Sequence, residues 1–582
     1  MTPHQLTNRG VIASCLSILA AIASSAWAAR PHGDPPTFNQ QVAPILFKHC
    51  SGCHRPGEIA ARLSLQSYED ARRHAGALKE QVLKRKMPPW PADPLHSLKF
   101  SNDTRLSEQD IGTLAAWADA GAPRGSGPET PRAPEPLRGW RHPDGRAPDA
   151  VVSLPEVSLA ANGEIPYLQQ RVKVPFPQDK WITAMQVRPS NDAVVHHMGI
   201  TEVKIDDSVS TEQLDQFAKM AALLGIPDGT AAAIHSAVVD PLNPDAYDML
   251  GVYTPGTTFE QYPPGSAKLL KGGANLYINA NIHYTTTGRP EKDRSQLALW
   301  FQESAPEHQL FRAPGAMSTL LANGRQLLTD DPGTKAEGTD VPIPPIPPYA
   351  SDFEIDGVTA YTGAVTIYQL QPHAHMRGKY FRYSVVYPDG REVTLLTVPK
   401  YDFHWQLAYA LAKPLHLPAG SKLVVIAHYD NSAQNRHLRN LQGELARNCG
   451  PQKQALFLRQ NQSWDEMFAP LIQYTVDSPA ADRHPPLAEA VGCLVREASM
   501  KWMLSGAGAP RDATIQSTSA ADVAAAAAMP MGNGRFELLG IQVFRAERYQ
   551  NKKVAVKGIF IGETGEARIN VTSLQPAGES CR

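Results

Sequence analysis

The chain has 582 residues, and at about 150 residues per domain this length predicts about four domains. The formal net charge is −1 and no long basic run occurs, so the sequence lacks the electrostatic signature of a nucleic-acid-binding protein. The 50 prolines exceed the usual share of ~5%, which favours strands and loops over long helices.

Residues 1–28 are expected to be a signal peptide. Arg9 supplies a positive charge, an apolar stretch runs from Val11 to Ile22, and the residues at 26–28 fit the small-x-small pattern that precedes cleavage. An uncleaved membrane anchor is the alternative, but the apolar stretch is shorter than the ~20 residues that a spanning helix needs. No later segment is long and apolar enough to cross a membrane, so we expect a periplasmic or secreted protein after cleavage.

The run Cys50-Ser51-Gly52-Cys53-His54 is the C-x-x-C-H pattern of covalent haem attachment. In this pattern two thioether bonds hold the porphyrin and the histidine binds the iron. The alternatives are a thioredoxin-like redox pair, half of a zinc site and a plain disulfide. A thioredoxin motif would follow a strand in a βαβ unit, which is absent, and a zinc site needs two more ligands. We therefore predict one covalent haem c on Cys50, Cys53 and His54.

The surroundings of this motif support the haem prediction. Helical spacing over residues 38–48 leads into it, and a later helix is predicted from Ser107 to Ala120. Met87 precedes a Pro-Pro pair on an extended loop, so we predict it as the second axial ligand rather than a methionine packed in a core. Residues 37–127 together resemble a class I cytochrome c domain, in the form found fused to larger bacterial enzymes. A Pro/Gly-rich linker is expected at 128–149.

Separated histidine groups occupy the middle of the chain. The first is the adjacent pair His196 and His197, the second is His283, and the third is the pair His373 and His375. Adjacent residues of a regular strand point to opposite faces, so His196 and His197 can share a metal only across a bend or a bulge. A lone histidine is more often structural, and a His-His pair by itself is a weak indication of metal binding.

Strand patterns lead into the second and third groups. Apolar residues alternate over 276–280, and we expect His283 on the same face of that strand. The β-rich run 365–370 precedes His373 and His375, whose i, i+2 spacing on a strand places both rings on one face. Neutral imidazoles combined with a thioether suit copper, because nitrogen stabilises both oxidation states and sulfur favours Cu(I).

A later run, Asp465-Glu466-Met467, adds such a thioether. Together and in this order, the groups resemble the copper type II, ascorbate-dependent monooxygenase family, which includes peptidylglycine α-hydroxylating monooxygenase and dopamine β-monooxygenase. The resemblance covers roughly residues 149–477. It implies two jelly-roll-like β-sandwich domains whose copper sites face one another across a solvent-filled cleft. By motif match, the electron-storing copper is expected on His196, His197 and His283, and the catalytic copper, which binds O2, on His373, His375 and Met467.

The sequence departs from the animal members of that family. Their disulfide framework is absent, since no cysteine lies between Cys53 and Cys449. An irregular stretch over 433–461 precedes Met467, which bears on the geometry of the second copper site. Groups that bind substrate cannot be transferred by motif, so the substrate stays undefined.

Other side chains compete for places around these sites. Met376 is a second thioether, but it neighbours His375 and is expected on the other strand face, so Met467 is favoured. His404 and His428 are expected to be structural, the alternative being a position just outside the copper ligands.

Residues 485–582 are predicted to form a small OB-like β-barrel. Its short strands are expected at 491–495, 501–504, 536–540, 553–560 and 568–571. The alanine-rich stretch 520–528 is expected to be a flexible interruption. Cys493 and Cys581 bracket the module and are candidates for a disulfide, with Cys449 leaving other pairings open. No aromatic-basic face is evident, so we interpret the module as structural or as a docking site for a partner.

These expectations combine into one fold class and one function. The fold is multidomain and mainly β, with a small α-helical cytochrome c domain, β-sandwich copper domains at 150–330 and 345–478, and the C-terminal barrel. The function is a copper-dependent monooxygenase that hydroxylates a C–H bond of an unknown substrate with O2, an external donor supplying electrons through the tethered haem. The alternative is an electron-transfer or copper-binding haem protein without hydroxylase activity. A copper nitrite-reductase-like enzyme is disfavoured, because no cysteine lies in the sandwich region before Cys449.

Overall fold

The computed structural model describes residues 34–56, 58, 60, 63–126, 133, 139–163, 165, 167–204, 249–254, 259–273, 275–316, 318–330, 343–439, 450–455, 463–477, 486–562 and 567–581. The expected signal peptide, Cys449 and about half of the expected linker lie outside these residues. The described chain consists mainly of strands in several largely antiparallel sheets, with a small helical region near its N-terminal end, which confirms the coarse fold class. Within these ranges, no helix combines the length and apolar character needed to span a membrane.

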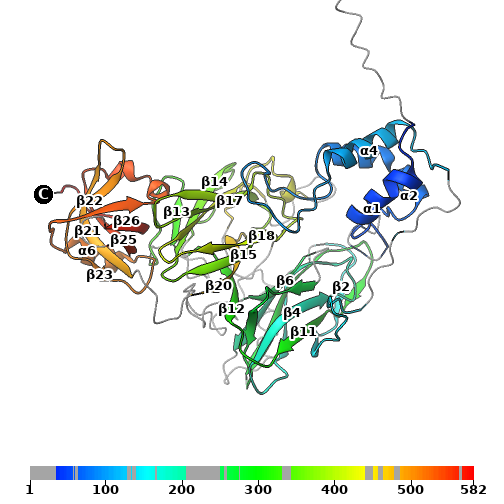
Figure 1. Cartoon of the computed structure of the whole chain (residues 1–582), viewed down its shortest axis with the longest axis horizontal. Helices are drawn as coiled ribbons and strands as arrows, with labels where there is room; N and C mark the ends of the chain where they lie inside the picture. The colour runs from blue at the N-terminus through cyan, green and yellow to red at the C-terminus, as the bar shows by residue number, and fades with distance from the viewer. Residues whose placement is uncertain are drawn as a thin grey trace, which may run out of the picture.

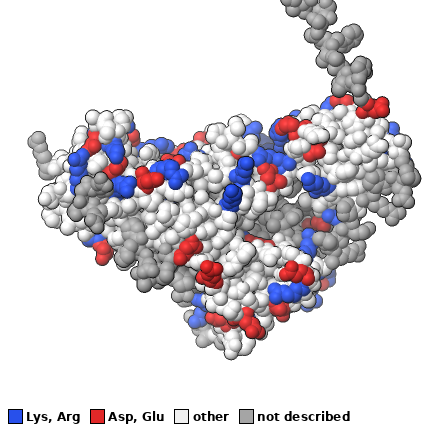
Figure 2. Space-filling model, in the orientation of Figure 1, with Lys and Arg blue, Asp and Glu red and all other residues white. Residues whose placement is uncertain are grey.

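The elements are arranged along an elongated molecule (Figure 1). The helical region lies at one end and the C-terminal module at the other, with the second sandwich between them and the first sandwich below. On the face drawn in Figure 2, acidic and basic side chains are interspersed, in agreement with a net charge near zero.

The helical region carries the predicted haem motif. Its elements are a π-helical turn (Phe38–Val42) and helices α1 (Ala43–His49), α2 (Tyr68–Arg73), α3 (Ala75–Leu83) and α4 (Glu108–Asp119). The helices predicted at 38–48 and 107–120 are confirmed, and Ser107 caps α4 by accepting a hydrogen bond from the backbone N–H of Asp110. Phe38, Leu114 and Trp117 are fully buried between these helices and form their core.

The first sandwich packs one sheet against another across an apolar core. One sheet carries His196, His197 and His283. Its order is β3 (Leu168–Lys173), β9 (Leu276–Tyr284), β5 (Val195–Lys204) and β6 (Met249–Tyr253). The opposing sheet begins with β1 (Ala150–Ser153), β11 (Gln296–Gln302), β4 (Lys180–Arg188) and β8 (Ser266–Leu270), and β7 (Phe259–Gln261) pairs with β4. A short ribbon of β2 (Val157–Leu159) and β10 (Glu291–Asp293) lies outside both sheets.

The opposing sheet continues into the second sandwich. From β8 it passes through β12 (His308–Pro314) to β20 (Ala469–Val476), β15 (Val365–His373) and β18 (Tyr409–Leu417). The facing sheet has the order β13 (Ser318–Leu321), β14 (Phe353–Ala360), β19 (Lys422–Tyr429), β16 (Gly378–Val386) and β17 (Glu392–Val398). Strand β13 (318–321) pairs with β14 of the second sandwich. The expected boundary at residue 330 had assigned these residues to the first sandwich. A shared sheet fixes the two sandwiches relative to one another.

A loop of the helical region is fastened to the second sandwich. The ring of Trp90 packs against Tyr409 with a centroid separation of 4.9 Å, and both side chains are buried. The backbone N–H of Asp93 donates to the carbonyl of Thr397 at 2.8 Å. The predicted axial ligand Met87 therefore lies three residues from a tryptophan that belongs to the core of the sandwich.

The C-terminal module closes on itself. The strands β21 (Leu487–Arg496), β22 (Trp502–Ala507), β24 (Gly534–Leu539), β26 (Arg568–Gly578) and β25 (Lys553–Ile561) pair successively, and β25 pairs with β21. The two-residue strand β23 (Arg511–Asp512) pairs with β21. Two 3-10 turns, at Gln542–Phe544 and Ala546–Tyr549, follow β24. Each of the strands predicted in this module is confirmed. So is the disulfide between Cys493 and Cys581, whose Cα atoms are 5.3 Å apart.

The expectation of a flexible stretch at 520–528 was wrong. These residues form helix α6 (Ala520–Ala527), which begins with a capping box between Ser519 and Asp522. Alanine has the highest intrinsic helix propensity, and the capping box satisfies backbone N–H groups at the helix start, so the alanine run folds rather than remaining irregular.

Candidate metal centre

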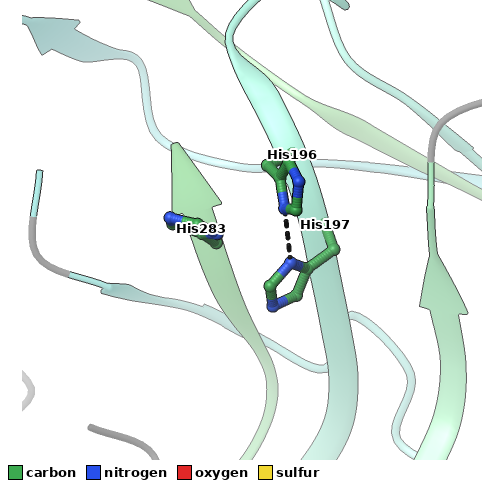
Figure 3. Close-up of side chains that lie close together, drawn as sticks. All are labelled: His196, His197 and His283. Carbon is green, nitrogen blue, oxygen red and sulfur yellow. Dashed lines mark hydrogen bonds between the residues drawn. The ribbon is translucent and has the colours of Figure 1, made fainter. Parts of the chain in front are cut away.

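A β-bulge on β5 brings His196 and His197 to the same side of the sheet. Opposite them on β9, His197 pairs with His283 and Val195 pairs with Tyr284, so His196 is the extra residue. Both imidazoles can therefore turn toward His283 on the neighbouring strand (Figure 3). This is the bulge that a shared metal requires of two adjacent histidines.

His283 lies on the opposite face of β9 from the one expected. Ile278, Ala280 and Ile282 are buried in the core of the first sandwich. His283 is an odd number of residues from Ala280, so the alternation of the strand turns its ring to the other face. There it meets the second sandwich, where the hydroxyl of Ser463 lies 3.3 Å from its Nε2.

The geometry of His196, His197 and His283 suits a shared ion. Their ring centroids are 4.9–5.2 Å apart, and one nitrogen from each lies within 4.8 Å of the others. The Nδ1 atoms of His196 and His197 are 3.0 Å apart, and two nitrogens that bind one ion at about 2.0 Å each are also roughly 3 Å apart. His283 Nδ1 is buried and has no hydrogen-bond partner among the described residues. A metal ion would satisfy it.

Burial keeps these imidazoles neutral. It lowers the pKa of His196 to about 3, and burial together with neighbouring imidazoles holds the pKa values of His197 and His283 well below the usual value. The exposed fractions of the three residues are 7%, 7% and 9%. Neutral imidazoles offer lone pairs, so the group is prepared for a metal at neutral pH.

His373 and His375 lie close together at the end of β15, although the expected strand does not reach both. The strand ends at His373, and His375 follows two residues later in the connecting turn, with the ring centroids 5.3 Å apart. His373 Nδ1 lies 2.6 Å from Oε1 of Gln406, an acceptor that fixes the proton on Nδ1 and directs Nε2 outward as a ligand atom. Burial lowers the pKa of His373 to about 4.

The run that contains Met467 packs against His375. The backbone N–H of His375 donates to Oε1 of Glu466 at 2.6 Å, and its Nδ1 lies 3.3 Å from the carbonyl of Asp465. Glu466 also accepts the backbone N–H of Arg377 at 3.1 Å. Burial raises the pKa of Glu466 to about 8, although Arg377 and these N–H groups act against that shift. Glu466 therefore ties the histidine turn to the segment that carries the predicted thioether ligand.

The two histidine groups are in contact. The rings of His197 and His373 have centroids 6.0 Å apart, and Tyr167 lies between the groups, 4.7 Å from His283 and 5.6 Å from His375. The resemblance implied sites facing one another across a solvent-filled cleft. In this structure the imidazoles of the two groups lie in contact instead, and the two sandwiches that carry them share one sheet.

Several side chains around the cluster carried no signal in the sequence. Phe403 stacks on His196 with a centroid distance of 5.5 Å, and the hydroxyl of Tyr167 lies 3.3 Å from His197 Nε2. Phe403 and Gln406 come from the connection between β17 and β18, far from the histidine motifs in the chain. Single aromatic and amide residues in loops have no periodicity or spacing, so only the tertiary structure identifies them.

The predicted haem motif follows helix α1. Cys50 and Cys53 are half-buried, unpaired thiols in this structure. His54 Nδ1 lies 3.0 Å from the carbonyl of Leu63, which places the proton on Nδ1 and leaves Nε2 as the ligand atom. Met87 is half-buried in the loop after α3. This arrangement fits a c-type haem held by the two cysteines, with His54 on the iron.

Of the remaining candidates, His428 contacts two carboxylates. Its Nδ1 lies 3.1 Å from Asp352 and its Nε2 lies 3.6 Å from Glu354. Asp352 directly precedes β14 and Glu354 lies within it, so these two carboxylates hold the His428 ring. His404, by contrast, lies next to Phe403, and its ring centroid is 6.0 Å from that of His196.

Comparison with known proteins gives no family. No protein-family profile matches the chain, and no curated protein matches its sequence. Structures of PNGF-II in the C2 and P21 space groups are similar with TM-scores of 0.22 and 0.20, at 8% and 9% identity over 58% and 56% of this chain. The match spans 66% and 65% of those PNGF-II chains. A structure of allantoicase has a TM-score of 0.13 and 8% identity, covering 47% of this chain and 81% of that one. We derive neither fold nor function from similarity at this level.

Proposed function

We propose that this chain is a copper-dependent monooxygenase that hydroxylates a C–H bond of an organic substrate. The observation that carries the proposal is the convergence of imidazoles from both sandwiches, most of them buried, into one cluster. Bound copper would supply one-electron chemistry with O2. In the overall reaction one oxygen atom enters the C–H bond, the other leaves as water, and two electrons and two protons are consumed.

The proposal assigns the ligands by group. The first copper is assigned to His196, His197 and His283, and the second to His373, His375 and Met467. Support for the first comes from the close nitrogens and the buried Nδ1 of His283. Support for the second comes from Gln406, which orients His373, and from Glu466, which holds the turn at His375. Nitrogen and thioether donors together suit copper better than zinc.

The same proposal assigns the other modules. Cys50, Cys53, His54 and Met87 would hold one haem c, which passes electrons from an external donor to the copper domains. The contact between Trp90 and Tyr409 supports this role, because it fixes the helical region on the sandwich that carries the second copper site. The closed strand order of the C-terminal module, with β24 parallel to β26, supports an OB-like barrel.

A periplasmic or secreted location belongs to the same proposal. The disulfide between Cys493 and Cys581 supports it, because disulfides persist in oxidising compartments. Attachment of haem c and removal of residues 1–28 would take place during export.

One observation favours a second candidate function, that of a copper and haem electron-transfer protein without hydroxylase activity. The two histidine groups pack directly against each other, and Tyr167 and Phe403 occupy the space around them. Electron transfer between metals needs such proximity, whereas hydroxylation also needs room for a substrate.

Incorporation of oxygen from O2 into a product separates the two candidate functions. The copper-loaded, haem-reduced protein would be screened against peptides, amines and lipids in ¹⁸O2, with Met467→Ala as the variant and His416→Ala as the surface control. We expect ¹⁸O in a hydroxylated product with the wild type and the control, and its loss in Met467→Ala. Haem oxidation without any labelled product would support the electron-transfer protein instead.

A further inference from the structure

A second cluster of metal-ligand side chains lies outside the proposed copper ligands. It consists of Asp402 and His404, on the connection between β17 and β18, and His437, on the 3-10 turn Arg436–Leu438 after β19. One potential ligand atom from each lies within 4.8 Å of the other two. From the sequence, His404 was expected to be structural or to lie just outside the copper ligands, and His437 carried no signal.

Both imidazoles approach the same carboxylate oxygen. Asp402 Oδ1 lies 3.0 Å from His404 Nδ1 and 3.7 Å from His437 Nε2, and the two ring centroids are 5.1 Å apart. Two nitrogens and one oxygen that converge in this way form a three-donor face with further positions open to water, since the His404 side chain is 60% exposed. The donors contain no sulfur, so they suit a divalent ion such as Zn²⁺ rather than Cu(I).

The surrounding contacts hold this arrangement in place. The side chain of Asn435 accepts the backbone N–H of His437 at 2.9 Å and donates to the carbonyls of Met376 and Asp430. The His437 side chain is only 9% exposed, and its Nδ1 has no hydrogen-bond partner in the described part of the chain. His437 is thus a positioned, buried side chain rather than a freely moving surface histidine.

Arg436 occupies the other side of the carboxylate. Its guanidinium binds Oδ2 of Asp402 and leaves Oδ1 toward the two histidines. Its Nε also lies 3.4 Å from His437 Nε2. A positive charge at this position opposes a cation, so the site would bind its ion reversibly and with moderate affinity.

Other histidine–carboxylate contacts on the described surface lack a second imidazole. His416 lies 3.1 Å from Asp477, and its side chain is 63% exposed, which closely matches His404. No further histidine belongs to that pair among the described residues. His416 therefore provides a matched control for the cluster.

We propose that Asp402, His404 and His437 bind a divalent transition-metal ion, Zn²⁺ being the expected occupant. This site is separate from the proposed copper ligands but adjoins them through Phe403, whose ring packs on His196 while its chain neighbours are Asp402 and His404. It goes beyond the proposed function and does not depend on it.

Titration with Zn²⁺ as the only added metal tests the proposal, using the full-length protein. Every variant is also titrated in a His196→Ala background, which separates this site from the first histidine group and removes any dependence on the copper assignment. We expect one Zn²⁺ per chain with the wild type and at least a tenfold weaker affinity with His404→Ala, whose exposed side chain can be removed without disturbing the core. His416→Ala should bind as the wild type does.

Arg436→Gln supplies a readout that a purely structural cluster would not give. Removing the guanidinium should tighten Zn²⁺ binding several-fold, because the repulsion is lost while Asp402 remains. Equal Zn²⁺ binding by the wild type and His404→Ala would overturn the proposal, as would the absence of Zn²⁺ binding by the wild type.

Discussion

The Nδ1 atoms of His196 and His197 lie 3.0 Å apart, although the two residues are neighbours in a β-strand. The bulge at His196 makes this approach feasible, because it turns an adjacent pair to one face of the sheet. The pair then meets His283 from the next strand (Figure 3). The one extra residue in β5 therefore brings three imidazole nitrogens together, although the His-His pair alone was a weak indication of metal binding.

Because of the bulge, we expect His196 and His197 both to be needed for binding of the first copper. His196→Ala and His197→Ala should each remove the first copper, since under the proposed assignment both rings bind the same ion. On a regular strand only one of the two would matter. Copper content after dialysis measures this, with His416→Ala as the surface control. Full copper retention in either variant would exclude a site shared by the pair.

Glu466 is predicted to position the second group of ligands. Glu466→Ala leaves the backbone N–H groups of His375 and Arg377 buried without their acceptor, which should cost about 2–4 kcal/mol of unfolding free energy. Chemical denaturation measures that loss, and copper analysis should find the second ion weakened and the first retained. Glu466→Gln, which keeps one acceptor oxygen, should fall between the wild type and the alanine variant. Loss of both coppers equally would instead indicate general unfolding.

Trp90 is predicted to hold the helical region, with its proposed haem, on the second sandwich. Trp90→Ala removes a buried ring packed on Tyr409, and should weaken this docking by about 3–5 kcal/mol. Limited proteolysis should then cut near residues 90–100 faster, and electron transfer from reduced haem to copper should slow. Leu95→Ala, a change at an exposed side chain, should alter neither. An unchanged electron-transfer rate in Trp90→Ala would argue against this route.

The buried amine of Lys422, which lies between the second sandwich and the C-terminal module, should make the free energy of unfolding depend on pH. Its ammonium donates to the carbonyls of Gly540 and Val571 at 2.8 and 2.6 Å, and burial lowers its pKa to about 7. The unfolded chain keeps this proton up to a pH of about 10.4, so between pH 7 and 10 the unfolded state binds more protons. Stability should therefore rise with pH in that window, by up to about 1.4 kcal/mol per pH unit from this group.

The measurement for Lys422 is the difference between the wild type and Lys422→Met in denaturation midpoints at pH 7, 8 and 9. Taking the difference removes the contribution of other titrating groups. The advantage of the wild type should grow with pH, because the penalty of burying the charge disappears as Lys422 loses its proton. A difference that is constant across this range would contradict a depressed pKa.

Local patterns predicted much of this fold. The helices around the haem motif and the strands of the C-terminal module follow from apolar periodicity, and the pairing of Cys493 with Cys581 follows from their bracketing positions. The alanine run after Ser519 was misinterpreted, because its composition was weighed without its capping box. His283 was expected on the same face of the strand as Ala280. It lies three residues after Ala280, and side chains alternate along a strand, so its ring points to the opposite face.

Tertiary contacts were beyond the reach of the sequence. The ordered histidine groups indicated the ligand candidates, but not that His197 and His373 lie in contact rather than across a cleft. That proximity depends on β12, which joins the sheets of the two sandwiches over a large sequence separation. Phe403 and His437 likewise reach their positions through loops that have no repeating pattern.

Metal analysis of the mature protein, expressed with haem maturation, tests the central claim most directly. The wild type would be compared with His283→Ala and Met467→Ala, with copper and iron counted per chain after removal of weakly bound ions. The account predicts two coppers and one iron in the wild type, with each variant losing or weakening one copper while keeping its iron. One copper or none, unchanged in Met467→Ala, would contradict the monooxygenase assignment.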